Sequence, residues 1–203
     1  MRNRTWFAVA ASAAAVLIAL NSLTAQSQVR KTADASHADG GHGADAAKVT
    51  AAVAVVHALG DNKVKGKVTF TQKDGGVEIL AELTGLTPGE HGFHVHEFGD
   101  CSVADGKCAG GHFNPTGAPH GSPDSEKRHV GDLGNIKAGE DGKATYKRLD
   151  KMITLSGSHS VIGRSVIIHA KADDMKTQPT GDAGDRVGCG TIGIADPKMQ
   201  MAH

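Results

Sequence analysis

Short runs in which hydrophobic and polar residues alternate fill the chain from residue 49 onward. Val68 and Phe70 occupy alternate positions of one run, and Ile79 and Ala81 do so in the next. Successive side chains of a β-strand point to opposite faces, so this period of two predicts strands with one buried face each. The runs, separated by turn-forming residues, lie at 49–59, 64–72, 77–83, 91–98, 143–148, 152–155, 165–170 and 190–195.

Two long segments rich in glycine and aspartate interrupt this pattern, at residues 99–135 and 171–188. Loops of this length inside a compact domain usually serve a function or are held by an internal clamp. The composition suits many short strands and tight turns, since 27 of the 203 residues are glycine and only 3% are aromatic. We therefore predict one all-β domain, either a β-sandwich or a small barrel.

The first 27 residues have the pattern of a secretory signal peptide. Arg2 and Arg4 precede an apolar run at residues 6–20, and small or polar residues then allow cleavage after Ala25 or Ser27. The alternative is an uncleaved membrane anchor, but the apolar run is shorter than the ~20 residues that span a bilayer. We expect secretion across the inner membrane into the periplasm, with no stable membrane insertion after cleavage.

Residues 28–47 contain almost no large apolar side chains, so we expect a flexible tail there. His37 and His42 offer ligands for a stray metal ion, and the other interpretation is a solvated spacer with incidental histidines. A second tail is expected at residues 197–203. Basic and acidic residues balance at 22 each, which argues against a nucleic-acid partner.

His94 and His96 are two positions apart in a predicted strand and therefore project from the same face. Together with His169 from a later strand they suit Cu(II), for which imidazole is a favoured ligand. In a generic strand, one such histidine often lies in the core with its nitrogens hydrogen-bonded. That explanation is weak for both histidines at once.

The first long loop contains four further metal-binding side chains, His112, His120, His129 and Asp132. Three imidazoles and one carboxylate fit a closed tetrahedral Zn(II) site, whose binding energy can order a loop. The alternative is a set of surface histidines in a flexible loop. Gly131 favours the metal site because it allows the chain to turn the Asp132 carboxylate back toward the same ion.

Arg186 lies in the second long loop, in a Gly- and Asp-rich stretch. A fixed guanidinium beside an open metal position would attract a small anion and hydrogen-bond to it. The other interpretation is an exposed arginine in a flexible loop. The three cysteines, Cys101, Cys108 and Cys189, leave one thiol over if two of them pair.

With these residues in place, the sequence closely resembles the copper/zinc superoxide dismutase family, in its secreted bacterial form. The matching stretches follow the family's order and cover nearly all of residues 48–196. They lie at residues 92–100, 110–115, 129–135, 155–157, 162–174 and 181–193. The resemblance implies an eight-stranded antiparallel Greek-key β-barrel, an immunoglobulin-like sandwich with two long functional loops.

The resemblance also implies one copper and one zinc ion per subunit. It assigns copper to His94, His96, His112 and His169, and zinc to His112, His120, His129 and Asp132. His112 would bridge the two ions as an imidazolate. Asp174 would accept hydrogen bonds from one ligand of each metal, and Arg186 would guide and hold superoxide.

The resemblance pairs Cys101 with Cys189 in a disulfide bond, which the compartment reached by a signal peptide would favour. Cys108 would then be a free thiol, and a bridge from Cys101 to Cys108 remains the alternative. The loop at residues 171–185 departs from the eukaryotic members of the family, because it is shorter and lacks their paired glutamates. Long-range attraction of the substrate by that loop cannot be assumed.

The function implied is disproportionation of superoxide into O2 and H2O2 by alternating reduction and oxidation of the copper ion. In this hypothesis His112 takes up a proton when its bond to copper breaks, and zinc holds its ring in place. The alternative is a non-enzymatic periplasmic buffer for copper and zinc on the same fold, although a buffer has no need for Arg186. A homodimer is left open.

Overall fold

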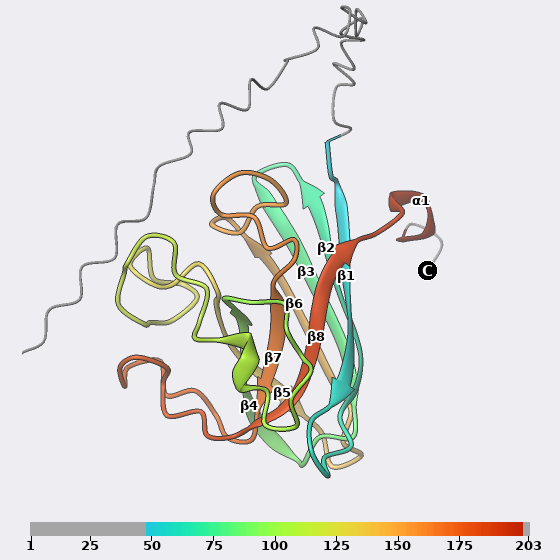
Figure 1. The fold of residues 1–203 in the computed structure, drawn as a ribbon, viewed down its shortest axis with the longest axis vertical. Coiled ribbons are helices and arrows are strands. Elements are labelled where there is room, and N and C mark those ends of the chain that lie inside the picture. The colour runs from blue at the N-terminus through green and yellow to red at the C-terminus, as the bar shows by residue number, and fades with distance from the viewer. Residues whose placement is uncertain (1–47, 201–203) are drawn as a thin grey trace, which may run out of the picture. The chain divides into compact units, whose positions relative to one another are not determined.

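The computed structural model describes residues 48–200, and eight antiparallel strands form a closed barrel within them (Figure 1). The predicted signal peptide, the tail with His37 and His42, and residues 201–203 lie outside the described residues. The strands are β1 (Ala51–Ala58), β2 (Lys65–Lys73), β3 (Gly76–Thr84), β4 (Gly89–His96), β5 (Asp132–Ala138), β6 (Ala144–Asp150), β7 (Ser165–His169) and β8 (Arg186–Ile194).

The order of strands around the barrel is β1-β2-β3-β6-β5-β4-β7-β8, and β8 pairs with β1 to close it. Strands β1, β2 and β3 are joined in sequence, whereas β3 pairs with β6 and β4 pairs with β7. These non-sequential antiparallel pairs are the mark of Greek-key connections. The fold expected from the family resemblance is therefore confirmed.

The inward-facing side chains of the alternating strands fill the interior of the barrel and form the core. Val68 and Phe70 on β2, Ile79 and Ala81 on β3, and Phe93 on β4 are all fully buried. Burying a side chain of the size of Phe or Ile stabilises the folded state by roughly 1.5–3 kcal/mol. The alternation seen in the sequence therefore sets the inner and outer faces of these strands.

Two strand predictions are wrong. Residues 152–155 contain a single bridge from Thr154 to Ser160, and the Asp150 carboxylate accepts hydrogen bonds from the Met152 and Ile153 amides instead of a strand partner. No strand is predicted at β5, whose first four residues fall at the end of the predicted long loop at 99–135. Its alternation is short and broken by Gly134, which adopts a positive φ of 75°.

Strand β4 is buried on both faces, unlike the other long strands. Phe93 and Val95 face the core, while His94 and His96 face outward and are still fully buried. The segments before β5 and after β7 cover this outer face, with Val95 hydrogen-bonded to Gly131 and Gly92 to Lys171. Covering loops thus create a buried polar compartment on the outside of the barrel.

A disulfide bond joins Cys101 in the first long loop to Cys189 in β8, as the family resemblance implied. Cys189 is fully buried against Leu59 and Ile167, and Cys108 is a free, exposed thiol. The loop contains the short helix η1 (Lys107–Ala109), and α1 (Pro197–Gln200) follows β8. Among the described residues, no helix is long and apolar enough to cross a membrane.

Candidate metal centre

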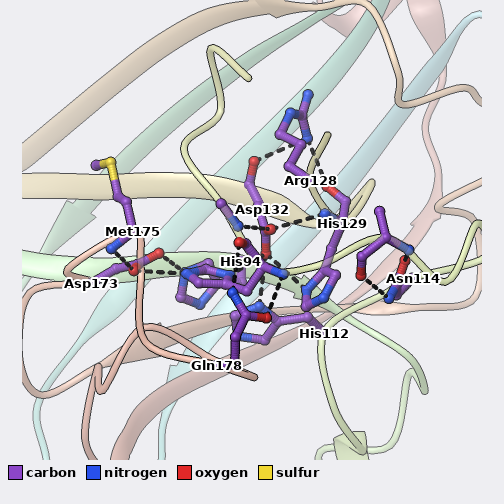
Figure 2. Close-up of polar contacts among 12 residues, drawn as sticks. His94, His112, Asn114, Arg128, His129, Asp132, Asp173, Met175 and Gln178 are labelled. Atoms are coloured by element: carbon purple, nitrogen blue, oxygen red, sulfur yellow. Dashed lines mark hydrogen bonds and ion pairs between the residues drawn. The ribbon is translucent and has the colours of Figure 1, made fainter. Parts of the chain in front are cut away.

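Seven buried side chains form two adjoining groups of metal-ligand type. Figure 2 labels four of them, His94, His112, His129 and Asp132. Within each group the ligand atoms lie within 4.8 Å of one another, and His112 belongs to both. The copper-side group consists of His94, His96, His112 and His169. The zinc-side group consists of His112, His120, His129 and Asp132. The structure therefore brings together all seven ligands that the resemblance implied.

The copper-side group is built on paired strands. His94 and His96 come from the outer face of β4, and His169 ends the neighbouring strand β7. The Nδ1 atoms of His96 and His169 lie 3.0 Å from the carbonyls of Gly110 and Gly184, respectively. The backbone thus fixes both rings, leaving their Nε2 atoms 3.4 Å apart and facing each other.

The zinc-side group converges on one carboxylate oxygen at the start of β5. Asp132 Oδ1 lies 2.8 Å from His112 Nδ1, 3.0 Å from His120 Nδ1 and 3.2 Å from His129 Nδ1. The other oxygen, Oδ2, accepts hydrogen bonds from the amides of Gly121 and His129, both 3.0 Å long. Three nitrogens and one oxygen around a common point suit a tetrahedral cation.

Four ring nitrogens in these groups are buried without a well-aligned hydrogen bond: His94 Nδ1, His112 Nε2, His120 Nδ1 and His129 Nδ1. The last two lie close to Asp132, but their alignment is too poor for a hydrogen bond. Buried polar atoms are costly unless they find a partner. Because these nitrogens belong to the two ligand groups, the donor set fits one metal ion on each side of His112.

Burial keeps the copper-side imidazoles neutral at physiological pH. Burial lowers the pKa of His94 to about 3 and that of His169 to about 4. The pKa of His96 falls well below its ordinary value for the same reason, and the nearby Arg186 guanidinium lowers it further. Neutral rings keep a free lone pair, which is the form that binds a cation.

The zinc-side group carries a negative charge on the Asp132 carboxylate. Burial alone would raise the pKa of Asp132 and lower that of His120. The hydrogen bond between His112 and Asp132, the hydrogen bond between His120 and Asp173, and the close approach of His120 to Asp132 outweigh it. As a result the pKa of Asp132 is held well below its usual range, and the pKa of His120 rises to about 9. An ionised carboxylate next to three imidazoles favours a divalent cation.

The carboxylate that joins the two groups is Asp173, and the prediction of Asp174 for this position is wrong. Asp173 Oδ2 lies 2.8 Å from His94 Nε2, and Oδ1 lies 2.9 Å from His120 Nε2. Asp174 is exposed and accepts hydrogen bonds from residues 176 and 177 of its own loop. Only the Asp173 side chain therefore faces the ligands, while the Asp174 carboxylate is turned into its own loop.

Arg186 begins β8 and lies beside the copper-side group. Its Nη1 and Nη2 donate hydrogen bonds to the carbonyls of Gly106 and Gly110, at 2.5 Å and 2.6 Å. The Gly110 carbonyl is also the partner of His96 Nδ1. Arg186 is therefore a half-buried, tethered cation instead of a flexible surface arginine.

Comparison with known proteins agrees with this geometry. A family model described as copper/zinc superoxide dismutase (SODC) matches residues 64–192 of the chain. The chain belongs to the copper/zinc superoxide dismutase family. It is 46% identical over 158 residues to "Superoxide dismutase [Cu-Zn] 3" of Arabidopsis thaliana, a match that covers 72% of this chain and 94% of that protein.

A solved structure of the clock protein EA4 is also similar to this member of the superoxide dismutase family. The two superpose with a TM-score of 0.67 at 45% sequence identity. The match covers 73% of this chain and 96% of the other.

Two glycines in this superoxide dismutase family member are required by close packing at the centre. A Cβ atom on Gly131 would lie 2.1 Å from the Val95 carbonyl oxygen, so the need is for space, since no positive φ occurs there. A Cβ atom on Gly181 would lie 1.8 Å from Asp173 Oδ1 and 2.7 Å from His120 Nε2. Any larger residue at either position displaces the parts that hold the zinc-side ligands.

Three residues that the sequence does not reveal support the backbone around the two ligand groups. Arg128 is 2% exposed, donates to the carbonyls of His129, Val130 and Asp132, and pairs with Asp150 on β6. Asn135 and Gln178 hold the backbones of Asp173 and His120. No spacing or periodicity marks these side chains, because most of their partners are backbone groups, which any sequence provides.

Proposed function

We propose that this protein is a superoxide dismutase, which converts two superoxide anions and two protons into O2 and H2O2. The observation that supports it best is the sharing of His112 between two complete, buried ligand groups. A copper ion held by His94, His96, His112 and His169 would supply the one-electron oxidation and reduction. Zinc held by the second group would keep the His112 ring in place.

The residues of the chain position charge and protons around the reaction. His112 Nε2 has no hydrogen-bond partner, so it can accept a proton whenever it is not bound to a metal and donate it to reduced superoxide. Its Nδ1 is held 2.8 Å from Asp132, which keeps the ring from rotating. The ring therefore stays aligned through the cycle.

Arg186 supplies the attraction for the anionic substrate. Its guanidinium is tethered by two loop carbonyls and lies close enough to lower the pKa of His96 and His169. A fixed positive charge in a cleft raises the arrival rate of an anion by about 10- to 1,000-fold. We place the anion beside this guanidinium, at an open position on the copper side.

The test is superoxide consumption by protein loaded with copper and zinc, in the wild type and in Arg186→Glu. The variant should react at least ~10-fold more slowly and lose most of its salt dependence, with its metal content unchanged. Lys63→Glu is the matched control, because it makes the same charge change at an exposed loop residue.

An unchanged rate in Arg186→Glu would contradict the role of the arginine. A fully loaded wild-type protein that leaves superoxide unconsumed would contradict the proposed function. That second result would favour a copper and zinc buffer on the same fold.

Secretion to the periplasm is part of the proposal. It is supported by the signal-peptide pattern of the first 27 residues and by the Cys101–Cys189 disulfide bond, since such bonds persist in oxidising compartments. Cell fractionation and N-terminal sequencing of the mature protein test it. A cytoplasmic protein that keeps Met1 would contradict it.

A further inference from the structure

We infer that Gln178 is a positioning residue for the zinc-side group, which it serves by holding the backbone of His120. The inference rests on the assignment of zinc to that group under the proposed function, although it does not depend on the reaction with superoxide. Gln178 lies in the second long loop, 58 positions from His120 in sequence, and Figure 2 places it beside the centre.

The side-chain amide of Gln178 satisfies both peptide groups of His120. Its Oε1 accepts a hydrogen bond of 2.8 Å from the His120 amide, and its Nε2 donates one of 2.9 Å to the His120 carbonyl. Within the described part of the chain, His120 makes no backbone–backbone hydrogen bond of its own. The glutamine therefore replaces the strand partner that this loop residue lacks.

The exposure of the two residues shows which one is being held. His120 is only 4% exposed, whereas Gln178 is on the surface. The amide covers a buried peptide segment that would otherwise have no protein partner, and such groups are costly to leave unpaired. Gln178 thus shields and hydrogen-bonds the backbone of a residue in the zinc-side group.

The same loop also holds the ring of His120. Asp173 Oδ1 lies 2.9 Å from His120 Nε2, and Asp173 is itself held by paired hydrogen bonds between its backbone and the side-chain amide of Asn135. Asp173 therefore holds the ring of His120, and Gln178 holds its backbone. With both fixed, His120 Nδ1 can point only toward the zinc position.

A turn at residues 174–181, closed by hydrogen bonds, positions Gln178 next to the His120 backbone. The Asp174 carboxylate accepts hydrogen bonds from the amides of Lys176 and Thr177, and the Gly181 amide donates to the Thr177 carbonyl. Asp174 in turn donates its own amide to the Gly181 carbonyl, which joins the two ends of the turn. This gives the exposed Asp174 a role: it shapes the short loop that presents the glutamine.

The experiment measures zinc release from the copper- and zinc-loaded protein into a chelator, with the Co(II) absorption spectrum of the zinc position as a second readout. Gln178→Ala should release zinc about 10-fold faster than the wild type, as is typical when a partner behind a metal ligand is removed. Its Co(II) spectrum should shift because the His120 ring is less constrained. Gln178→Glu keeps the acceptor for the His120 amide and loses the donor, so an intermediate rate is expected.

Gln72→Ala is the matched control, because the Gln72 amide also bonds to backbone carbonyls but does so in the β2–β3 hairpin. It should leave both readouts unchanged. If Gln178→Ala fails to fold, Gln178→Asn replaces it, since a side chain shorter by one methylene cannot reach both groups. Equal zinc release and equal Co(II) spectra in the Gln178 and Gln72 variants would overturn the inference, even if the protein consumes superoxide.

Discussion

Asp173 links the two halves of the centre through its two carboxylate oxygens. One oxygen orients His94 on the copper side and the other orients His120 on the zinc side. Hydrogen bonds from both rings hold its pKa well below the usual range although burial opposes this, so the group is ionised at neutral pH. A single charge thus fixes one ring in each group.

Replacing Asp173 by Asn should weaken the binding of both metals. The amide keeps one acceptor and puts a donor opposite a ring N–H, so one of the two histidines loses its support. We expect copper and zinc affinities to fall by about 10- to 100-fold in competition titrations with chelators. Asp182→Asn, an exposed position in the same loop, is the control. Unchanged affinities in Asp173→Asn would contradict the linking role.

The ligands themselves were predictable from the sequence, whereas their supports were not. His94 and His96 follow from the two-residue period of a strand, and the zinc-side group follows from its residue types in one loop. The choice between Asp173 and Asp174 depends on which side of an irregular segment faces inward. Gln178 and Arg128 bind backbone groups, which any sequence provides, so no pattern marks them.

The Cys101–Cys189 disulfide bond attaches the first long loop to the last strand of the barrel. The cysteines are 88 positions apart, and Cys189 is fully buried next to Ile167 of β7. The same loop supplies the carbonyls of Gly106 and Gly110 that tether Arg186. The bond therefore stabilises the fold and also limits the movement of the loop that tethers the Arg186 guanidinium.

Replacing both cysteines by serine should lower the free energy of unfolding. By the chain-entropy model, a crosslink that closes a loop of this length contributes about 4 to 5 kcal/mol. Urea unfolding of Cys101→Ser/Cys189→Ser against wild type measures the loss. Cys108→Ser should leave stability unchanged, because that thiol is free and exposed. A double variant as stable as wild type would contradict the stabilising role and leave only the restraint of the first long loop.

At the level of elements, alternation predicted the strands that face a uniform core and failed at irregular ones. Residues 152–155 place the apolar Ile153 and Leu155 two positions apart, as a strand would. Both are buried, but they belong to an irregular segment that the Asp150 carboxylate holds. Strand β5 was missed because it starts with the metal-ligand residue Asp132 and contains Gly134. Local polarity cannot identify a strand whose first residues serve the site.

At the scale of the whole molecule, four buried histidines with lowered pKa values lie together on the outer side of the barrel. Burial lowers the pKa of His94, His96, His112 and His169 from the ordinary value of 6.5, whereas His120 is raised to about 9. The unfolded chain binds more protons than the folded one below pH 6.5, where the first four titrate only on unfolding. It binds fewer above about pH 7, where the unfolded histidines have lost most of their protons and His120 remains protonated in the fold.

The metal-free protein should therefore be most stable at about pH 7, where the folded and unfolded chains bind equal numbers of histidine protons. Between pH 6.5 and pH 5, each lowered histidine removes up to about 2 kcal/mol of stability, and above pH 6.5 the contribution of His120 is lost gradually toward pH 9. Urea unfolding of metal-free protein across this range measures the curve. A stability that is flat between pH 5 and pH 6.5 would contradict the burial of neutral rings.

The central claim is that two ligand groups share His112 and that this arrangement supports the dismutation of superoxide. The most direct measurement is the metal content of the reconstituted protein together with its superoxide consumption, in wild type and in His112→Ala. We predict one copper and one zinc ion per wild-type chain with rapid consumption. In His112→Ala we predict weakened binding of both metals and loss of the reaction. Binding of a single metal by the wild type, or full activity without His112, would contradict the account.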